Sequence, residues 1–125
     1  MNITTESGAD AAAAEASLVH PAAPGPEHLA AVTAALRMLA EPTRLHLLWQ
    51  LSQGPRSVGE LVDATGAART VVSQHLAKLR LSGMVQAHKR GRHVIYSVPD
   101  GHLHRLVAEI VNHTDHRLTG EPVHE

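Results

Sequence analysis

The chain has 125 residues, a length that suits one compact domain with a tail and is too short for two domains. It has no cysteine, which excludes disulfides, thiolate metal sites and cysteine nucleophiles, so any metal must be held by nitrogen and oxygen ligands. The formal net charge is −1, and 11 residues are histidine, the side chain that binds borderline metals and titrates near neutral pH.

The N-terminal residues, 1–26, are rich in Ala, Pro, Gly and Ser, and this composition predicts a disordered tail. The structured domain is expected over 27–118, followed by a short C-terminal tail over 119–125. No apolar run approaches the roughly 18 residues of a membrane helix, and no basic segment leads into an apolar one at the N-terminus. These features predict a cytoplasmic protein with no membrane partner.

Two helices are predicted to follow the tail. Residues 27–40 and 44–53 have apolar side chains at helical spacing, and Pro42 between them suits a helix entry. The first apolar stripe is formed by Leu29, Val32, Leu36 and Leu39, and the second by Leu45, Leu48, Trp49 and Leu51. We expect Trp49 to belong to the core because it lies within that stripe.

A pair of short helices with a tight turn comes next. Ser57 and Glu60 form a capping-box pattern at the start of the first helix, and Gly66 ends it. The second helix is expected over 68–80, and its inward residues are Val72, Leu76 and Leu79. This arrangement is typical of a helix-turn-helix, whose second helix enters the major groove of DNA. The predicted DNA-contacting residues of that helix are Arg69, Thr70, Ser73, Gln74, His75 and Lys78.

A β-hairpin is predicted after the helix-turn-helix. Residues 84–88 and 93–98 have the alternating character of strands, and they flank a basic tip that contains Gly91. A hairpin in this position is a wing, and its cations, Lys89, Arg90 and Arg92, are expected to contact phosphate or the minor groove.

Charge is distributed unevenly along the chain. Residues 64–99 contain no acid, yet they hold six of the 11 Lys and Arg residues. A local basic surface on a nearly neutral protein favours a polyanion partner, which here is double-stranded DNA. The alternative is an amphipathic helix with a polar solvent face and a solvated basic loop.

The last predicted helix opens at Asp100 and ends near Gly120. Three of its histidines share one stripe: His113 lies about 20° around the helix from His102, and His116 lies about 40° to the other side, at 100° per residue. The separation from His102 to His113 is roughly 16 Å along a helix, whereas zinc holds its ligands at about 2.0–2.2 Å, so one chain cannot complete a site.

Two antiparallel copies of this helix about a two-fold axis would complete two identical sites. Each site would have Asp100 and His102 from one copy with His113 and His116 from the other, a set that suits tetrahedral zinc. The alternative is a helix on which Asp100 is only an N-cap and the histidines are solvent-exposed by chance.

The order helix, helix, helix-turn-helix, basic wing and C-terminal helix resembles the ArsR/SmtB family of metal-sensing winged-helix repressors, over about residues 27–118. The matching segments are Glu41-Pro-Thr-Arg44-Leu, Val72-Ser-Gln-His75-Leu-Ala-Lys78-Leu, Gly91-Arg-His-Val-Ile-Tyr96-Ser and the C-terminal Asp-x-His, ten residues, His-x-x-His pattern. The last pattern is similar to the intersubunit site of the branch that senses zinc, cobalt or nickel.

This resemblance implies a mainly helical fold with a β-hairpin wing, a homodimer formed through terminal helices, and a function in transcription rather than catalysis. It implies a metal-free dimer on palindromic operator DNA that is released when metal binds, with two ions per dimer. Zinc is the expected metal, and cobalt and nickel are the alternatives. We predict that the second ring nitrogen of His102 or His113 donates to backbone of the recognition helix.

Three rival functions are a zinc hydrolase, a histidine-rich metal buffer and a winged-helix regulator that does not respond to metal. A hydrolase needs an open coordination position and a general base, and no motif for these is present. A buffer would not explain the acid-free span or the wing. A nickel sensor would need further ligands, for which His20, His104 and His124 are candidates, but His104 is predicted to face away from His102.

Overall fold

The computed structural model describes residues 22–120 of the chain. In order, its elements are α2 (Pro26–Leu39), α3 (Pro42–Ser52), β1 (Arg56–Ser57), α4 (Val58–Thr65), α5 (Arg69–Leu81), β2 (Gln86–Arg90), β3 (His93–Ser97) and α6 (Gly101–Thr119). The chain divides into two compact units, Met1–Ala34 and Ala35–Glu125, whose boundary falls within α2. Most of the predicted N-terminal tail lies outside the described residues, as do His20 and His124.

The helices begin and end close to the local signals that predicted them. The capping box of α4 is complete: Ser57 Oγ accepts from Glu60 N at 3.2 Å, and the Glu60 carboxylate accepts from Ser57 N at 2.9 Å. Gly66 closes α4 in the left-handed conformation, with φ of 70°. α3 begins at Pro42 rather than at 44, because the Glu41 carboxylate caps it by accepting from Arg44 N at 2.7 Å.

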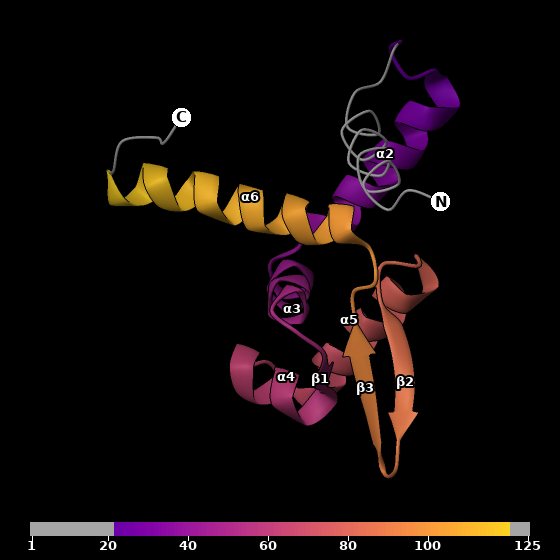
Figure 1. The fold of residues 1–125 in the computed structure, drawn as a ribbon, viewed down its shortest axis with the longest axis vertical. Coiled ribbons are helices and arrows are strands. Elements are labelled where there is room, and N and C mark those ends of the chain that lie inside the picture. The colour runs from indigo at the N-terminus through magenta and orange to yellow at the C-terminus, as the bar shows by residue number, and fades with distance from the viewer. Residues whose placement is uncertain (1–21, 121–125) are drawn as a thin grey trace, which may run out of the picture. The chain divides into compact units, whose positions relative to one another are not determined.

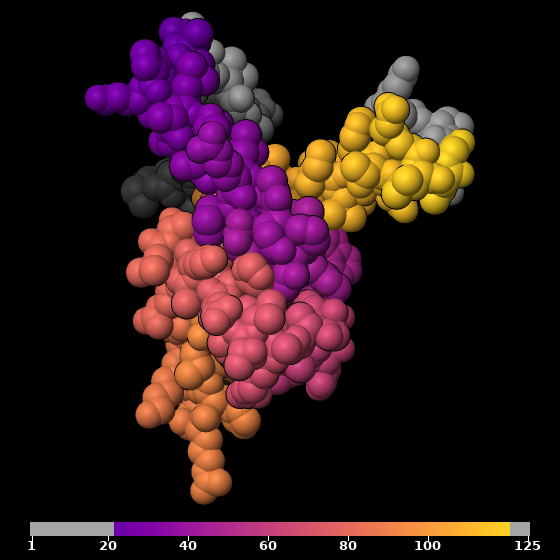
Figure 2. Space-filling model, turned by 180° about the vertical axis from the view of Figure 1, so that it is seen from behind, coloured from indigo at the N-terminus to yellow at the C-terminus, as the bar shows by residue number. Residues whose placement is uncertain are grey.

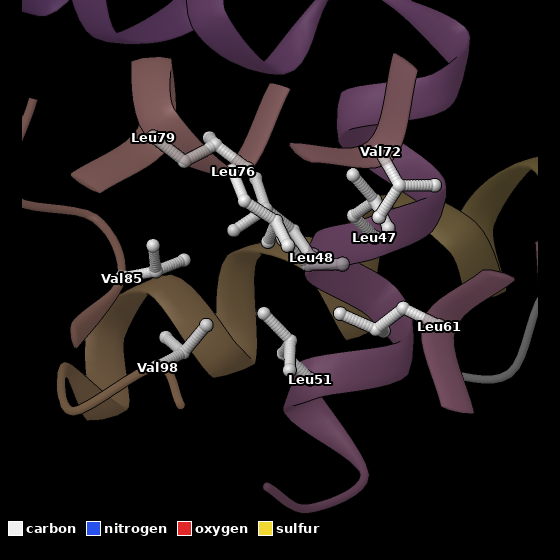
Figure 3. Close-up of a cluster of buried hydrophobic side chains, with 10 residues drawn as sticks. Leu47, Leu48, Leu51, Leu61, Val72, Leu76, Leu79, Val85 and Val98 are labelled. Atoms are coloured by element: carbon white, nitrogen blue, oxygen red, sulfur yellow. The ribbon is translucent and has the colours of Figure 1, made fainter. Parts of the chain in front are cut away.

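The hydrophobic core joins α3, α4, α5 and the start of α6. Figure 3 shows buried aliphatic side chains of α3, α4 and α5 pointing toward one another. Its members are Leu47, Leu48, Leu51, Leu61, Val72, Leu76, Leu79, Val85, Val98 and Val107. The three predicted inward residues of α5 are among them, and Trp49 packs against the cluster as predicted. This core holds α5 against α3 and α4, so the predicted helix-turn-helix is present.

A three-stranded antiparallel sheet has the order β1-β3-β2. The hairpin was predicted, but β1 was not, because two residues have no readable period and pair only through tertiary contact with β3. The strand β2 continues to Arg90, so Lys89 and Arg90 lie on the strand rather than in the tip, where they were expected. The turn needs only Gly91 and Arg92, because Gly91 takes a φ of 60°, as two-residue hairpin turns require.

The helix α6 crosses α3, while the hairpin projects from the opposite side of the helical body (Figure 1). Figure 2 shows from behind that the C-terminal half of α6, in yellow, also extends away from that body. Asp100 caps the helix and Gly120 ends it with φ of 72°, as predicted. None of the helices within residues 22–120 is long and apolar enough to cross a membrane.

Candidate nucleic-acid interface and metal-ligand pairs

The recognition helix α5 separates an apolar and a polar face. Val72, Leu76 and Leu79 have no exposed surface and hold the helix against the core. The opposite face consists of exposed side chains that can donate hydrogen bonds to base edges or phosphates. These residues are Arg69, Thr70, Ser73, Gln74 and Lys78.

His75 differs from the other predicted DNA contacts of α5. It is half-buried, and its Nε2 lies 3.6 Å from Oε2 of Glu41 at the start of α3. Because His75 follows Val72 by three residues and precedes Leu79 by four, it belongs to the inward stripe. Helical spacing could have revealed this position. In this structure His75 contacts α3 rather than presenting its ring with Gln74 and Lys78.

The wing places its cations on more than one side of the hairpin. Lys89, Arg90 and Arg92 are all exposed, but successive side chains of a strand point to opposite faces, so Lys89 and Arg90 diverge. Arg92 lines a hollow of about 190 Å³ together with Arg69 of α5 and the start of α4. The recognition helix and the wing turn therefore share one recess that two arginines line.

Two carboxylates have lowered pKa values because they cap helices. The pKa of Glu41 is held below its ordinary value mainly by the backbone hydrogen bond from Arg44, with a smaller contribution from His75. The pKa of Glu60 is lowered mainly by the backbone N–H and the hydroxyl of Ser57. Both groups are structural acids of helix starts rather than candidates for catalysis.

Asp100 and His102, which we call the N-terminal pair, lie at the start of α6. The Asp100 carboxylate accepts a hydrogen bond from His102 N at 2.8 Å through Oδ1. Its other oxygen, Oδ2, is not used in this cap and could bind a metal ion. The His102 ring is exposed, and its Nδ1 lies 2.8 Å from the Arg105 guanidinium. Both residues line a hollow of about 320 Å³ with residues 82–84, which directly follow α5. The N-terminal pair therefore adjoins the end of the recognition helix.

His113 and His116, the C-terminal pair, lie far along the same helix. His113 is exposed and His116 is half-buried. One continuous helix separates the two pairs by roughly 16 Å. Within residues 22–120 of a single chain, no group of three or more His, Asp or Glu side chains could hold a metal ion together. The structure brings together the members of each pair but does not join the pairs.

His104 is a further residue of interest that sequence reasoning assigned to no contact. As predicted, it lies on another side of α6 from His102, but its half-buried ring contacts the protein. Its Nδ1 is 3.1 Å from the carbonyl oxygen of Ser52, and its Nε2 is 2.6 Å from that of Val98. The predicted backbone link from His102 or His113 to the recognition helix stays a prediction, whereas His104 makes a link to α3 and to the end of β3.

Comparison with known proteins relates this architecture to bacterial regulators. Residues 41–87 match the family model described as bacterial regulatory protein, arsR family. The chain is 38% identical over 93 residues to the HTH-type transcriptional regulator KmtR of Mycobacterium tuberculosis, covering 74% of this chain and 72% of that protein. Over 93 residues it is 42% identical to the HTH-type transcriptional repressor SmtB of the same species, covering 74% and 69%.

A solved structure is similar over much of the chain. It is the homodimeric winged helix-turn-helix DNA-binding domain of Mb0332 from Mycobacterium bovis, a possible ArsR-family regulator. The TM-score is 0.66 with 31% identity, and the match covers 78% of this chain and 90% of that one.

Proposed function

This chain belongs to the ArsR/SmtB family of metal-sensing transcriptional repressors, and from that premise we propose that it is a homodimer that releases operator DNA when zinc binds between its subunits. It is a DNA-binding regulator rather than an enzyme. The observation that carries the proposal is the division of the ligand set between the two ends of α6, which leaves each chain with two incomplete sites.

Antiparallel pairing of α6 about a two-fold axis would complete both sites. Each would contain Asp100 and His102 of one subunit with His113 and His116 of the partner subunit. One carboxylate and three imidazoles suit zinc, which accepts tetrahedral geometry without penalty, and cobalt can replace it. Asp100 Oδ2 is available for this role because the N-cap hydrogen bond uses Oδ1.

An exposed apolar surface supports a dimer through the terminal helices. Leu106 and Ile110 of α6 are 46% and 47% exposed, and Leu36 of α2 is 50% exposed. Trp49 and Val111 border an open apolar hollow between α3 and α6. Apolar patches of this kind mark protein contacts, and a second copy would cover them while bringing the ligand pairs together.

Metal and DNA would act on each other through linkage. The N-terminal pair shares a hollow with residues 82–84, so an ion held there would bias the position of the end of α5. The two recognition helices must match half-sites about 34–36 Å apart, and a rotation of one subunit would misplace them. If zinc weakens DNA binding by a factor, DNA weakens zinc binding by the same factor, usually about 5–150-fold.

Ligand variants test the proposal. We expect His102→Ala and His113→Ala each to abolish tight zinc binding, because each removes one ligand from both symmetric sites, while the variants stay dimeric and keep DNA bound when zinc is added. Fluorescence anisotropy with operator DNA and a zinc competition assay measure the two effects. Asp63→Ala, which removes an exposed helical carboxylate outside both pairs and outside the proposed dimer and DNA surfaces, is the matched control. DNA release by either ligand variant at wild-type zinc concentrations would contradict the assignment.

Mixing the two variants gives a sharper test of the split site. A heterodimer of His102→Ala and His113→Ala keeps one complete site and loses two ligands from the other, so one zinc per dimer should return. A site formed within one chain would show no recovery on mixing. Bound cobalt should give the intense visible absorption of a four-coordinate ion, whereas a weak six-coordinate spectrum would favour nickel or cobalt sensing.

A further inference from the structure

The ring of His104 lies at the point where α6 meets the remainder of the domain. It reaches the carbonyl oxygen of Ser52, the last residue of α3, at 3.1 Å and that of Val98, just beyond β3, at 2.6 Å. The Ser52 carbonyl belongs to the last turn of α3, where helix carbonyls have no intrahelical partner. Val98 is 6% exposed and belongs to the core. One side chain therefore joins the sensing helix to two buried elements.

We propose that His104 is the positioning residue through which metal binding at the start of α6 displaces the DNA-binding module, defined as α3 through β3. The inference rests on the proposed function, because it concerns how zinc occupancy reaches DNA. His104 itself contacts neither the ion nor the DNA in this scheme.

The geometry of the first turns of α6 supports this role. His104 follows His102 by two residues, so the two rings lie about 200° apart around the helix. A metal ligand and an anchor to the module thus occupy opposite sides of one short segment. Any rotation or shift of this segment that optimises metal coordination must move the His104 ring relative to Ser52 and Val98. Rigid packing transmits such a shift because Val107, one turn further along α6, is 1% exposed in the core.

A neutral His104 ring can donate a hydrogen bond to only one of its two carbonyl partners at a time. A carbonyl oxygen only accepts hydrogen bonds, and a neutral imidazole has one N–H. One tautomer donates from Nδ1 to Ser52 of α3, and the other donates from Nε2 to Val98 at the end of the wing strand. The partner that receives the hydrogen bond depends on small changes in the two distances. His104 can therefore favour α3 or the wing as α6 moves.

The path from His104 to the recognition helix is short. Leu48 and Leu51 of α3 belong to the same buried cluster as Leu76 and Leu79 of α5. Packed side chains at this density resist independent movement, so a displacement of α3 is passed to α5. The hollow beside residues 82–84 offers metal a second, direct route, and His104 would act in addition to it.

The test compares the coupling between zinc and DNA in His104→Ala, His104→Gln and the control Asp63→Ala. His104→Ala should keep its zinc affinity and its metal-free DNA affinity near wild-type values, while the zinc-induced loss of DNA affinity falls well below the wild-type factor. The part of the loss that passes through the hollow beside residues 82–84 should remain. His104→Gln retains a side-chain N–H donor and should keep part of the coupling. Asp63→Ala should keep all of it, because Asp63 is an exposed residue of α4 that belongs neither to the ligand pairs nor to the predicted DNA contacts.

The ¹⁵N chemical shifts of the His104 ring in the wild-type protein give a second measurement. Zinc would not change these shifts if His104 had a purely structural role. Zinc should shift the ring ¹⁵N resonances of His104, because the preferred donor nitrogen changes. If His104→Ala and His104→Gln retain the full zinc effect, or if the ring resonances stay in place, the inference is overturned. A parallel loss of folding stability, zinc affinity and metal-free DNA affinity in both variants would also overturn it in favour of a structural anchor.

The wild-type protein separates this inference from the proposed function. A wild-type dimer whose DNA affinity ignores zinc would overturn the proposed function together with the link that rests on it. A normal wild-type response that His104→Ala preserves would overturn the link alone.

Discussion

The helices α5 and α6 differ in how much of their structure one chain completes. In the 13 residues of α5, Val72, Leu76 and Leu79 have no exposed surface. In the 19 residues of α6, Val107 is the buried residue, and Leu118 is 87% exposed. The recognition helix is thus held by its own chain, whereas α6 displays apolar side chains and the two proposed ligand pairs. This difference fits the proposed function, because a helix that reads DNA needs a rigid scaffold, whereas a metal site shared between subunits needs a partner.

The largest effect that we predict tests this difference directly. Leu76→Ala should lower the free energy of unfolding by about 2–5 kcal/mol, because it leaves a cavity at the centre of the core. Ile110→Ala on α6 should act mainly on dimer dissociation, since the side chain is 47% exposed in one chain. Urea unfolding and sedimentation equilibrium measure the two quantities. Similar losses of unfolding free energy with unchanged dimerisation would show that α6 is not an interface.

The polar face of α5 can be compared with the wing. Gln74→Ala should cost about 1–3 kcal/mol of binding free energy at particular operator positions, because a base-edge contact is lost. Arg92→Ala should weaken binding to all sequences alike and reduce the salt dependence, because a phosphate contact releases counterions. Anisotropy titrations on operator and random DNA at several salt concentrations distinguish them. Equal losses on both DNAs for Gln74→Ala would remove it from the base-reading set.

The carboxylate cap at the start of α3 predicts a pH dependence. Glu41 has a pKa below its ordinary value of 4.5, so its carboxylate stabilises the fold above that pH, and the contribution is lost as pH falls through the lowered pKa. Glu41→Gln should cost roughly 1 kcal/mol of unfolding free energy at pH 7, since a charged helix cap is lost.

Unfolding of wild type and Glu41→Gln between pH 7 and pH 3 measures this effect. The difference between the two proteins should shrink below pH 4.5. Glu60→Gln provides a comparison of the same sign at the start of α4, since the pKa of Glu60 is also lowered. A difference that stays constant with pH would show that charge at Glu41 does not stabilise the cap.

The smallest predicted effect concerns the exposed side of α6. The Arg105 guanidinium only donates hydrogen bonds, so its contact with His102 Nδ1 occupies a lone pair of a proposed ligand and places a positive charge beside the ion. Arg105→Ala should therefore raise zinc affinity, by up to about 1 kcal/mol for an exposed interaction. Competition with a zinc chelator measures this change, and Arg105→Lys retains the charge as a control. Weaker zinc binding by Arg105→Ala would show that Arg105 supports the site.

Sequence analysis did not predict the contacts that two histidines of the functional surfaces make with residues far away in the sequence. His75 was grouped with the DNA contacts although helical spacing places it on the inward side of α5, and its partner there, Glu41, lies 34 positions earlier in the sequence (75 minus 41). His104 was expected only to face away from His102, and its contact with the carbonyl oxygen of Ser52, 52 residues away in the sequence, was not predicted. Periodicity says which side of a helix a residue occupies, but it does not say which element packs on that side.

The sequence by itself determined the helix-turn-helix and, to within a few residues, the helix limits, and it is the source of the proposed split ligand set. Ser57 with Glu60, Gly66 and Asp100 act on backbone groups within a few residues, so their effects follow from local spacing. Only the tertiary structure decided the pairing of β1 with β3, the extension of β2 to Arg90 and the anchoring of His104. These features arise because backbone groups and half-buried rings need hydrogen-bond partners. The packing of the core decides which groups are close enough to serve, and those groups can be far apart in the sequence.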